Sequence, residues 1–290
     1  MSVRISETDL IINPNGSVYH LGLKPEDIAD VIITVGDPER VAKVSQYFDQ
    51  VEHRQVHREF CAHTGWIGKQ RLMVISSGMG TDNVEILLTE LDALANVDFA
   101  TRKVKQILRR LTIIRVGTSG SLQADVPVDS YVINQHAFGL DTLMQFYPPC
   151  MSKSEEEWSG QLGEHLDLRF VPYCATASEG LLATWQQDYT VGTTVTCPGF
   201  YAPQGREVRI VPRPTRLVKR LTTFRFDSQR LTNLEMETAG YYALGDLLGH
   251  RVVSLNAILA NRVSQKFSNH PAKTIDRLIR KVLGKVETIP

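Results

Sequence analysis

The chain has 290 residues, of which 32 are lysine or arginine and 32 are aspartate or glutamate, so its formal net charge at neutral pH is zero. This balance gives the protein no overall field that would attract nucleic acid or an anionic membrane surface. No apolar stretch is long enough for a membrane span, the N-terminal residues show no signal-peptide pattern, and the four cysteines are scattered. We therefore expect a cytoplasmic protein with free thiols and with neither nucleic acid nor membrane among its partners.

The first structural signals are an irregular segment and then a strand that leads into a helix. Residues 1–25 carry turn formers, and their histidine, His20, would by default be a surface residue. The apolar run Asp30–Val35 predicts a buried strand. It is followed by Gly36 for a tight exit, Asp37 as helix N-cap, Pro38 and, one turn into the helix, Arg40. A strand that ends at a helix N-terminus is typical of an anion site, although a well-capped crossover helix has the same pattern.

Histidine and glycine patterns in the next segment bear on two kinds of site. His53 and His57 are four residues apart, but no helical apolar stripe and no H-E-x-x-H motif accompanies them, so we expect no metal site. The predicted strand Arg71–Ser76 leads through Gly78-x-Gly80 into a helix over Glu85–Leu94. The third glycine of a dinucleotide loop is absent, and close backbone approach to a small ligand is the better interpretation.

Residues 96–123 are expected to form a helix and then a strand with an unusual charge. Apolar residues recur at helical spacing within the basic run Arg102–Arg110, which we interpret as the solvated face of a helix that extends over Asn96–Arg110. The strand Leu111–Gln123 contains Arg115 and is predicted to break into a turn at Gly117–Gly120. Burial of an unpaired charge is costly, so Arg115 needs an anion nearby, and the hydroxyls and amides of such a turn bind phosphate or sugar oxygens. The alternative is an ordinary strand end with Arg115 paired to a carboxylate.

Strands and helices alternate along the rest of the chain. Further strands are predicted at Ser130–Gln135, Val171–Ala177, Tyr189–Cys197 and Arg251–Leu259, and helices at Leu234–Leu248 and Thr274–Val286. Residues 141–163 are expected to form a surface excursion or a short helix. The alternation predicts one α/β domain over residues 1–290 with a mixed, mostly parallel central sheet flanked by helices.

Two polar groups in the second half could bind a ligand. The loop Pro198–Arg206 combines aromatic rings, an amide and an arginine, which suit a flat heterocycle, although a solvated turn is the alternative. The acids of Glu235-Met236-Glu237 could bind sugar hydroxyls or simply favour a helix dipole.

Four motifs occur in one order: Gly36–Val41, His57–Phe60, Arg115–Gly120 and Glu235–Glu237. Together they resemble the nucleoside phosphorylase superfamily, and its uridine phosphorylases in particular, over about His20 to Arg262. The resemblance implies a single α/β domain around a partly barrel-like sheet.

The resemblance also implies roles for individual residues. The phosphate-binding positions are Gly36, Arg40, Arg58, Arg115 and Thr118, of which Arg58 comes from a neighbouring subunit. The ribose-binding positions are His20, Thr118, Glu235, Met236 and Glu237, with His20 given across the interface. The base-binding positions are Ser119, Gly120, Phe200, Gln204, Arg206 and Arg262. The catalytic positions are Arg206, Gln204, Arg115 and Glu237.

The activity implied is reversible phosphorolysis of uridine to uracil and ribose 1-phosphate, with phosphate as co-substrate and no metal or other cofactor. Purine-specific relatives have a Ser-Asp pair where this chain has Asn261-Arg262, whereas Gln204 and Arg206 suit a uracil anion. A purine nucleoside phosphorylase, a phosphate-independent nucleosidase and, remotely, a non-catalytic nucleoside-binding or storage protein are the alternatives.

The resemblance further implies a homodimer as the minimal active unit, in which residues 1–25 contribute to a shared site through His20. Family members also form hexamers built from dimers, and the pattern is compatible with a monovalent cation at the subunit interface. The chain departs from compact bacterial members by an insert at Asn96–Arg110 and by Gly205, which stands where some members have an acid.

Overall fold

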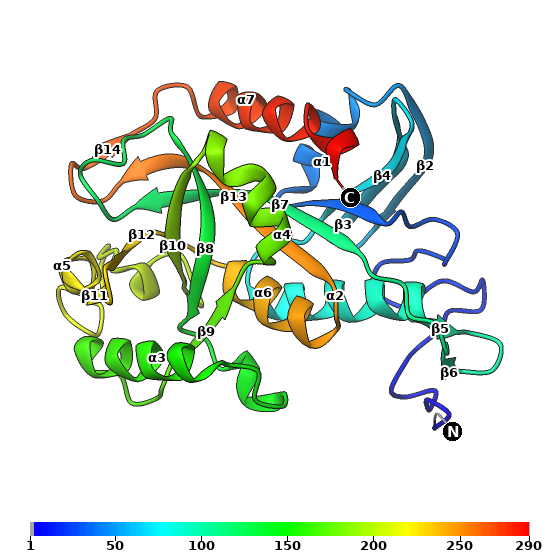
Figure 1. Ribbon diagram of the computed structural model, residues 1–290, viewed down its shortest axis with the longest axis horizontal. Helices are drawn as coiled ribbons and strands as arrows, with labels where there is room; N and C mark the ends of the chain where they lie inside the picture. The colour runs from blue at the N-terminus through cyan, green and yellow to red at the C-terminus, as the bar shows by residue number, and fades with distance from the viewer. Residues whose placement is uncertain (1–2, 290) are drawn as a thin grey trace.

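The computed structural model describes residues 3–289, and its elements alternate between strand and helix (Figure 1). The strands are β1 (Val31–Val35), β2 (Gln50–His57), β3 (Phe60–Ile67), β4 (Gln70–Ser76), β5 (Val97–Asp98), β6 (Lys103–Val104), β7 (Thr112–Ser121), β8 (Tyr131–Gly139), β9 (Tyr173–Thr176), β10 (Thr190–Thr196), β11 (Arg225–Phe226), β12 (Gln229–Glu235), β13 (Arg251–Asn261) and β14 (Lys266–Phe267). The α-helices are α1 (Pro38–Ser45), α2 (Thr81–Asn96), α3 (Lys153–Leu166), α4 (Glu179–Trp185), α5 (Leu217–Thr223), α6 (Thr238–Leu247) and α7 (Pro271–Leu283). Short 3₁₀ helices are η1 (Leu143–Phe146), η2 (Gln186–Asp188), η3 (Ala202–Gln204) and η4 (Val286–Thr288).

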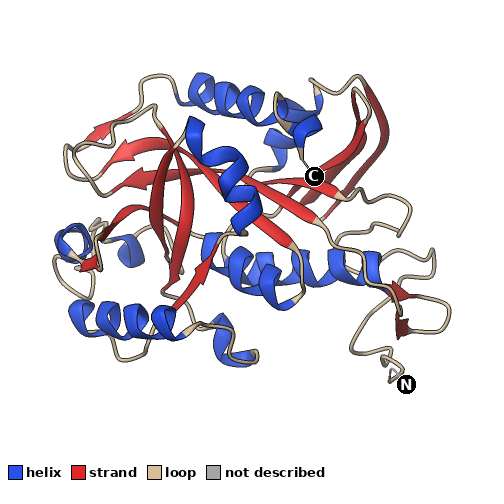
Figure 2. Cartoon of the chain, viewed as in Figure 1, coloured by secondary structure: helices blue, strands red, loops and turns tan. Residues whose placement is uncertain are grey.

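Within the described residues, one sheet contains all strands except the β5–β6 hairpin, and helices lie on both sides of it (Figure 2). Neighbouring strands follow the order β11-β12-β10-β8-β13-β7-β1-β4-β3-β2, with β14 beside β13 and β9 beside β8. Strand β12 also pairs with β7, through Leu234 opposite Gly120 and Asn233 opposite Ser121. This pairing closes β12, β10, β8, β13 and β7 into a five-stranded barrel, and β1, β4, β3 and β2 extend from it as an open sheet.

The central strands pair mostly in parallel, as the sequence predicts. Strand β1 is parallel to β4 and β7, β7 to β13, and β10 to both β8 and β12. Antiparallel pairs join β13 to β8, β12 to β7, and the β2–β3–β4 edge. The mixed α/β fold with partly barrel-like closure is therefore confirmed.

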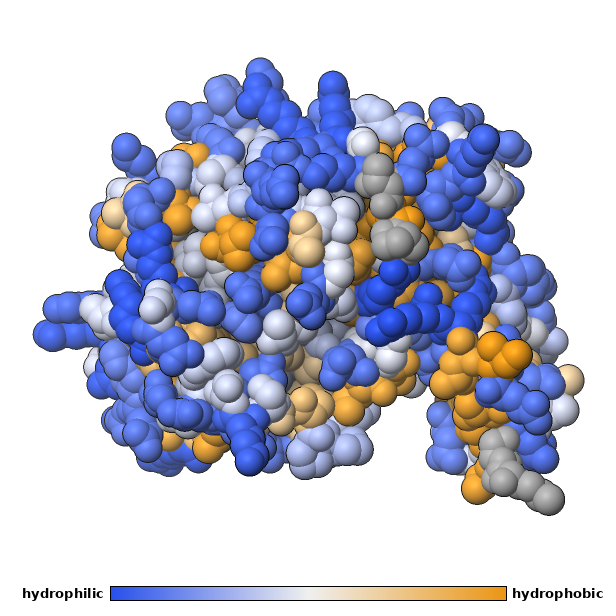
Figure 3. Space-filling model, viewed as in Figure 1, coloured by the Kyte–Doolittle hydropathy of each residue, from blue (hydrophilic) through white to orange (hydrophobic). Residues whose placement is uncertain are grey.

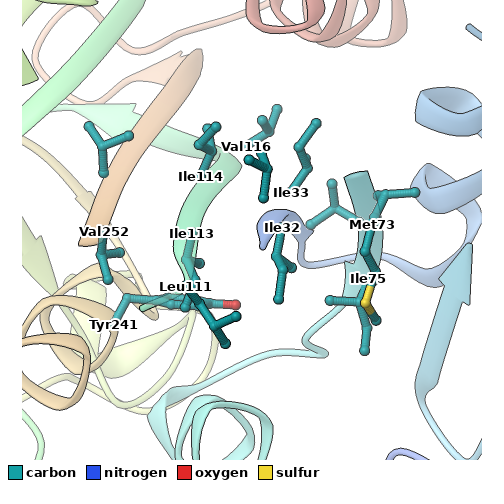
Figure 4. Packing of buried hydrophobic residues seen from close by; sticks show 14 of the residues in the cluster. Ile32, Ile33, Met73, Ile75, Leu111, Ile113, Ile114, Val116, Tyr241 and Val252 are labelled. Carbon is teal, nitrogen blue, oxygen red and sulfur yellow. The ribbon is translucent and has the colours of Figure 1, made fainter. Parts of the chain in front are cut away.

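The main core is built from apolar residues that lie in register across the parallel strands. Val252 of β13 is opposite Ile113 of β7, which is opposite Ile32 of β1, and Ile32 is opposite Met73 of β4. Figure 4 shows this row together with Tyr241 of α6, and all five side chains are at most 2% exposed. Helix α6 also packs against α2. Strands buried on both faces explain why these segments are continuous apolar runs in the sequence.

The local signals before α1 are confirmed. Asp37 is the N-cap of α1, and its Oδ1 accepts a hydrogen bond from the Glu39 backbone N–H at 2.9 Å. Pro38 is the first helical residue, and Gly36 lies between β1 and this cap.

The predicted turn at Gly117–Gly120 is wrong, because β7 continues without a break to Ser121. Its second half is paired in parallel with β13 as far as Asn261 and in antiparallel with β12. Pairing with β13 and β12 provides hydrogen-bond partners for backbone groups that the predicted turn would have left free for a ligand. The sequence of this segment is therefore that of a barrel strand.

The predicted helix over Asn96–Arg110 is also wrong, since α2 ends at Asn96 and the β5–β6 hairpin follows. Asp98 stabilises the hairpin turn by accepting hydrogen bonds from the backbone N–H groups of Ala100 and Thr101. Arg102 is buried, and its guanidinium donates to carbonyls of the N-terminal segment, among them Ser6 at 2.7 Å. Arg102 therefore fastens the N-terminal segment to the hairpin through Ile5, Ser6 and Leu10.

The N-terminal segment is irregular, as expected, with one isolated bridge between Ile12 and Val18. The start of this segment and the β5–β6 hairpin project from the body at the lower right of Figure 3, where apolar surface is visible, whereas Val18, Leu21 and Leu23 are buried in the main core. Of the region predicted as a surface excursion or short helix, the second part is α3, which begins after the Ser152 N-cap. Among the described residues, no helix combines the length and apolar character needed to cross a bilayer. The four cysteines are unpaired.

A second core lies beside the barrel and predicts a large effect of one substitution. The ring of Phe226, 1% exposed, lies 5.1 Å from that of Trp158 and 5.4 Å from that of Phe138. Phe226→Ala should lower the free energy of unfolding by about 3–5 kcal/mol, because it leaves a cavity among these rings. Phe146→Ala, at a side chain that is 83% exposed, should change it by less than about 0.5 kcal/mol. Denaturant unfolding of both variants measures the difference, and equal values would contradict this account of the core.

Candidate active site

A cavity of about 730 Å³ lies where β1 and β4 end, beside the second half of β7 and the end of β12. Ligands of open α/β sheets bind at such strand ends. The predicted site residues that line the cavity are Gly36, Arg40, Arg115, Thr118, Ser119, Gly120, Phe200, Gln204, Arg206, Glu235, Met236 and Glu237. His20, Arg58 and Arg262 are not among the lining residues.

Arg115 is a buried charge that lines this cavity. Its Nη2 lies 2.5 Å from Glu237 Oε2 and 3.1 Å from Glu235 Oε2. Its Nη1 donates to Asn256 Oδ1 at 2.9 Å. Burial by itself would lower the pKa of Arg115, but the two carboxylates outweigh it and raise this pKa above its ordinary value. Arg115 is thus paired to carboxylates and also lines the cavity. The pairing predicted by one interpretation of the sequence is therefore compatible with the ligand-facing position predicted by the other.

Gly117 makes the position of Arg115 feasible. Residues 115 and 117 point to the same face of β7, because side chains alternate along a strand. A Cβ atom at position 117 would lie 2.1 Å from Arg115 Nη1 and 2.7 Å from Asn256 Oδ1. Only glycine leaves room for the guanidinium to lie along the strand.

The two glutamates differ in their partners. Glu235 accepts hydrogen bonds from Thr196 Oγ1 at 2.6 Å and from the backbone N–H groups of Glu237 and Thr238 at 2.9 Å, so it fixes the start of α6. Glu237 accepts from the Gly80 backbone N–H at 2.9 Å, which ties α6 to the start of α2. Burial raises the pKa of Glu237, Arg115 opposes this shift, and the charge of Glu235 adds to it.

Arg40 provides a second guanidinium next to Arg115. Its Nη1 donates to the Val116 carbonyl at 3.3 Å. Burial lowers the pKa of Arg40, the Asp37 carboxylate opposes this, and the charge of Arg115 lowers it further. An arginine remains protonated at neutral pH, so this end of the cavity presents two cations to an anion.

The opposite end of the cavity is formed by the loop that contains η3. The Arg206 guanidinium carbon lies 3.7 Å from the centroid of the Phe200 ring, and its Nη1 donates to Gln204 Oε1 at 2.5 Å. Because this oxygen accepts from Arg206, the Nε2 amide of Gln204 is the donor that remains for a ligand. Burial and the charge of Arg262 lower the pKa of Arg206 to about 10.

Two further features hold this loop in place. Arg262 donates from Nη1 to the Gln204 carbonyl at 3.0 Å, so it supports the loop from outside the cavity. Gly205, between Gln204 and Arg206, has φ +66°, a backbone conformation that favours glycine.

His20 and Arg58 lie outside the cavity but close to a common neighbour. The Tyr19 ring contacts the His20 ring edge-on at 4.9 Å between centroids, and the Arg58 guanidinium carbon lies 4.8 Å from the Tyr19 centroid. Arg58 is exposed, and the His20 side chain is 30% exposed. The two residues are thus presented together on the surface.

The cavity also contains residues that the sequence analysis did not assign to it: Glu59, Met79, Asn83, Leu259 and Phe267. Met79 lies within the Gly78-x-Gly80 pattern and Asn83 shortly after it. The close approach of a small ligand that this pattern predicts could therefore have identified both residues. Met79, Phe267 and Phe200 are each at least half exposed and give the mouth an apolar rim. Within residues 3–289, no group of three or more His, Cys, Asp or Glu side chains is arranged to hold a metal ion.

The model of the phosphorylase superfamily matches residues 30–284. The chain belongs to this superfamily. A uridine phosphorylase from Thermococcus kodakarensis is 29% identical over 252 residues, which are 87% of this chain and 80% of the relative. The crystal structure of a Trypanosoma brucei nucleoside phosphorylase that shows uridine phosphorylase activity is 29% identical, with a TM-score of 0.89 over 97% of this chain and 100% of that one. A DeoD-type purine nucleoside phosphorylase from Streptococcus thermophilus is 35% identical over only 120 residues, 41% of this chain and 45% of the relative.

The close approach at Gly117 predicts a specific loss of stability. Gly117→Ala should lower the free energy of unfolding by about 1–3 kcal/mol, because the added methyl group displaces the buried guanidinium. Gly160→Ala is the matched control, since no atom beyond the adjoining backbone of α3 lies within 4 Å of the added Cβ there, and it should stabilise by up to about 1 kcal/mol. Denaturant unfolding distinguishes the two, and an unchanged Gly117→Ala protein would show that the guanidinium does not need this space.

Proposed function

We propose that this protein catalyses the reversible phosphorolysis of uridine to uracil and ribose 1-phosphate. The observation that carries the proposal is that one cavity is lined by the neighbouring guanidinium groups of Arg40 and Arg115, by the carboxylate of Glu237, and by the aromatic ring, amide and guanidinium of Phe200, Gln204 and Arg206. These are the groups that suit phosphate, sugar hydroxyls and a flat base respectively. The similarity to uridine phosphorylases over most of the chain supports this assignment.

At the phosphate end we assign Gly36, Arg40, Arg115 and Thr118 to the anion. Arg115 also binds Glu237, which we assign to the ribose together with Met236. In the described structure Glu235 is occupied by Thr196 and the start of α6, so its part in binding the ribose is to hold Arg115 and Glu237 in place. Phosphate is thereby positioned next to the anomeric carbon, and this orientation provides much of the rate.

The bond from ribose to the base breaks as the phosphate oxygen forms its bond to the anomeric carbon. The electron pair of the breaking bond stays with N1 of uracil and spreads onto the carbonyl oxygens. We assign Gln204 and Arg206 as the donors that stabilise this developing charge, and Phe200, Ser119 and Gly120 as the walls of the base site. Arg262 acts through the Gln204 carbonyl.

A homodimer is the minimal active unit in this proposal. Glu235 and Glu237 offset the charges of Arg40 and Arg115 within the cavity, so a phosphate dianion requires a further cation. Arg58 and His20 do not line the cavity of their own chain, and both are presented at the surface beside Tyr19. We assign them to the phosphate and the ribose of the adjoining subunit.

Three alternative functions fit the residues of this site less well: a purine phosphorylase, a phosphate-independent nucleosidase and a storage protein. A purine phosphorylase profits from an acid near N7, whereas this chain has Arg262 at the matching position, and Asn261 is occupied by carbonyls of Gln123 and Val126. A nucleosidase or a storage protein has no need of Arg40 and Arg115, together with Arg58 of the adjoining subunit, around a phosphate.

One ultraviolet assay separates these activities. Uridine, thymidine and inosine are incubated with and without inorganic phosphate, and the absorbance change on loss of the base is followed. Uridine should be consumed only when phosphate is present. Consumption of inosine in preference, or loss of uridine without phosphate, would overturn the proposed function.

The division of roles predicts the behaviour of Arg206→Ala. Its kcat should fall by about 10²–10³-fold, the usual effect of removing one donor to a developing anion, while the KM for phosphate stays close to the wild-type value. Arg209→Ala is the control, because Arg209 is an exposed arginine of the same loop. Equal losses in kcat and in phosphate affinity would contradict the assignment of Arg206 to the base.

A further inference from the structure

Glu90 is a buried carboxylate of α2 that the roles above leave unused. It is 7% exposed and lies against the segment that carries His20. Its oxygens accept hydrogen bonds from the His20 backbone N–H at 3.0 Å, from the Leu21 backbone N–H at 2.8 Å and from His20 Nδ1 at 2.7 Å. One side chain therefore holds both the backbone and the ring of His20.

These contacts determine which ring nitrogen of His20 carries the proton. An ionised carboxylate only accepts hydrogen bonds, so the short contact requires a proton on Nδ1. In the neutral imidazole Nε2 then has a lone pair and accepts from a hydroxyl. The contact with Glu90 thus selects one tautomer of the partly exposed His20 ring. In this tautomer Nε2 is the atom that can accept a hydrogen bond from a sugar hydroxyl.

The carbonyl of His20 is held from the opposite side. His57 Nδ1 donates to this carbonyl at 2.8 Å, and His57 directly precedes Arg58. Gly22 has φ +66°, and a Cβ atom there would lie 3.1 Å from His57 Cβ, so the segment packs closely on β2. His20 and Arg58 are in this way parts of one rigid surface cluster, which we define as Tyr19, His20, His57, Arg58 and Glu90.

None of the five residues of the cluster lines the cavity of its own chain. The start of α2 borders the cavity through Gly80, whose N–H binds Glu237. Asn83 of α2 lines the cavity, and the seven residues from Asn83 to Glu90 span about 10 Å at 1.5 Å per residue of helix. Because Glu90 fixes His20 at this point, the imidazole stays away from its own cavity.

We propose that Glu90 is the positioning residue for the histidine that each subunit gives to the ribose of its neighbour. It sets the tautomer and direction of the His20 ring before substrate binds. The inference rests on the proposed function, since it needs a phosphorolysis site that His20 of the adjoining subunit completes.

The first test is a double-mutant cycle on the full-length protein. Glu90→Gln keeps the size of the side chain and an oxygen for the backbone N–H groups, but its amide donates to Nδ1 and so favours the other tautomer. We expect kcat/KM for uridine to fall about 10-fold to 100-fold, the value of one charge-assisted hydrogen bond. In a His20→Ala background the same change should cost almost nothing, because the two residues act as one unit.

Additive losses in the cycle would overturn the positioning role and leave Glu90 a structural residue. Glu85→Gln is the matched control, since it makes the same change in the same helix, where the carboxylate binds Tyr147 at 2.5 Å. If Glu90→Gln does not fold, Glu90→Asp, which keeps the carboxylate, takes its place in the cycle.

The second test uses mixed dimers and identifies the site on which Glu90 acts. The Glu90→Gln and Arg206→Ala chains are unfolded and refolded together. In a mixed dimer, the intact cavity of the Glu90→Gln chain receives an intact His20–Glu90 pair from the Arg206→Ala chain. Activity should therefore exceed the sum of the two separate variants. No gain on mixing would overturn the inference, whereas a wild-type protein without phosphate-dependent loss of uridine would overturn the proposed function itself.

Discussion

The ion pairs of Arg115 with Glu235 and Glu237 hold together three segments that meet at the cavity. Arg115 belongs to β7, Glu235 ends β12, and Glu237 precedes α6. A buried guanidinium is stable only when its charge is paired, and removal of one partner leaves an uncompensated charge. The pairing of β12 with β7 that closes the barrel also brings these charges together, so barrel closure and the assembly of the cavity depend on the same contact.

The same ion pairs leave the cavity without a surplus of positive charge at its phosphate end. Glu235 and Glu237 pair with Arg115, Asp37 and Glu237 offset the charge of Arg40, and a doubly charged anion must find further cations. This balance gives a physical reason for a site that is shared between subunits, because a third cation of the same chain would repel the first two while the site is empty.

Structural features that depend on residues close together in the sequence could be predicted from it. The strand, glycine and N-cap before α1 are confirmed because each signal acts within a few residues. The predictions of a turn at Gly117 and of a helix around Arg102 failed because the residues that explain these positions are distant in the sequence. Gly117 leaves room for Arg115 and Asn256, and Arg102 binds carbonyls of the N-terminal segment. No pattern in the sequence indicated a role for Glu90, because its hydrogen-bond partner His20 lies 70 residues earlier. Arg115 was identified because a charge inside an apolar strand is anomalous by itself.

The position of β2 at the open edge of the sheet has a consequence for solubility during folding and assembly. An edge strand exposes unpaired backbone groups that can recruit a strand from another molecule. The exposed positions of β2 are Gln50, Glu52, Arg54 and Val56, and the two charged side chains among them oppose such unwanted pairing. The charges of Glu52 and Arg54 therefore oppose the recruitment of a foreign strand at the edge that ends beside Arg58, the residue that we assign to the neighbouring subunit.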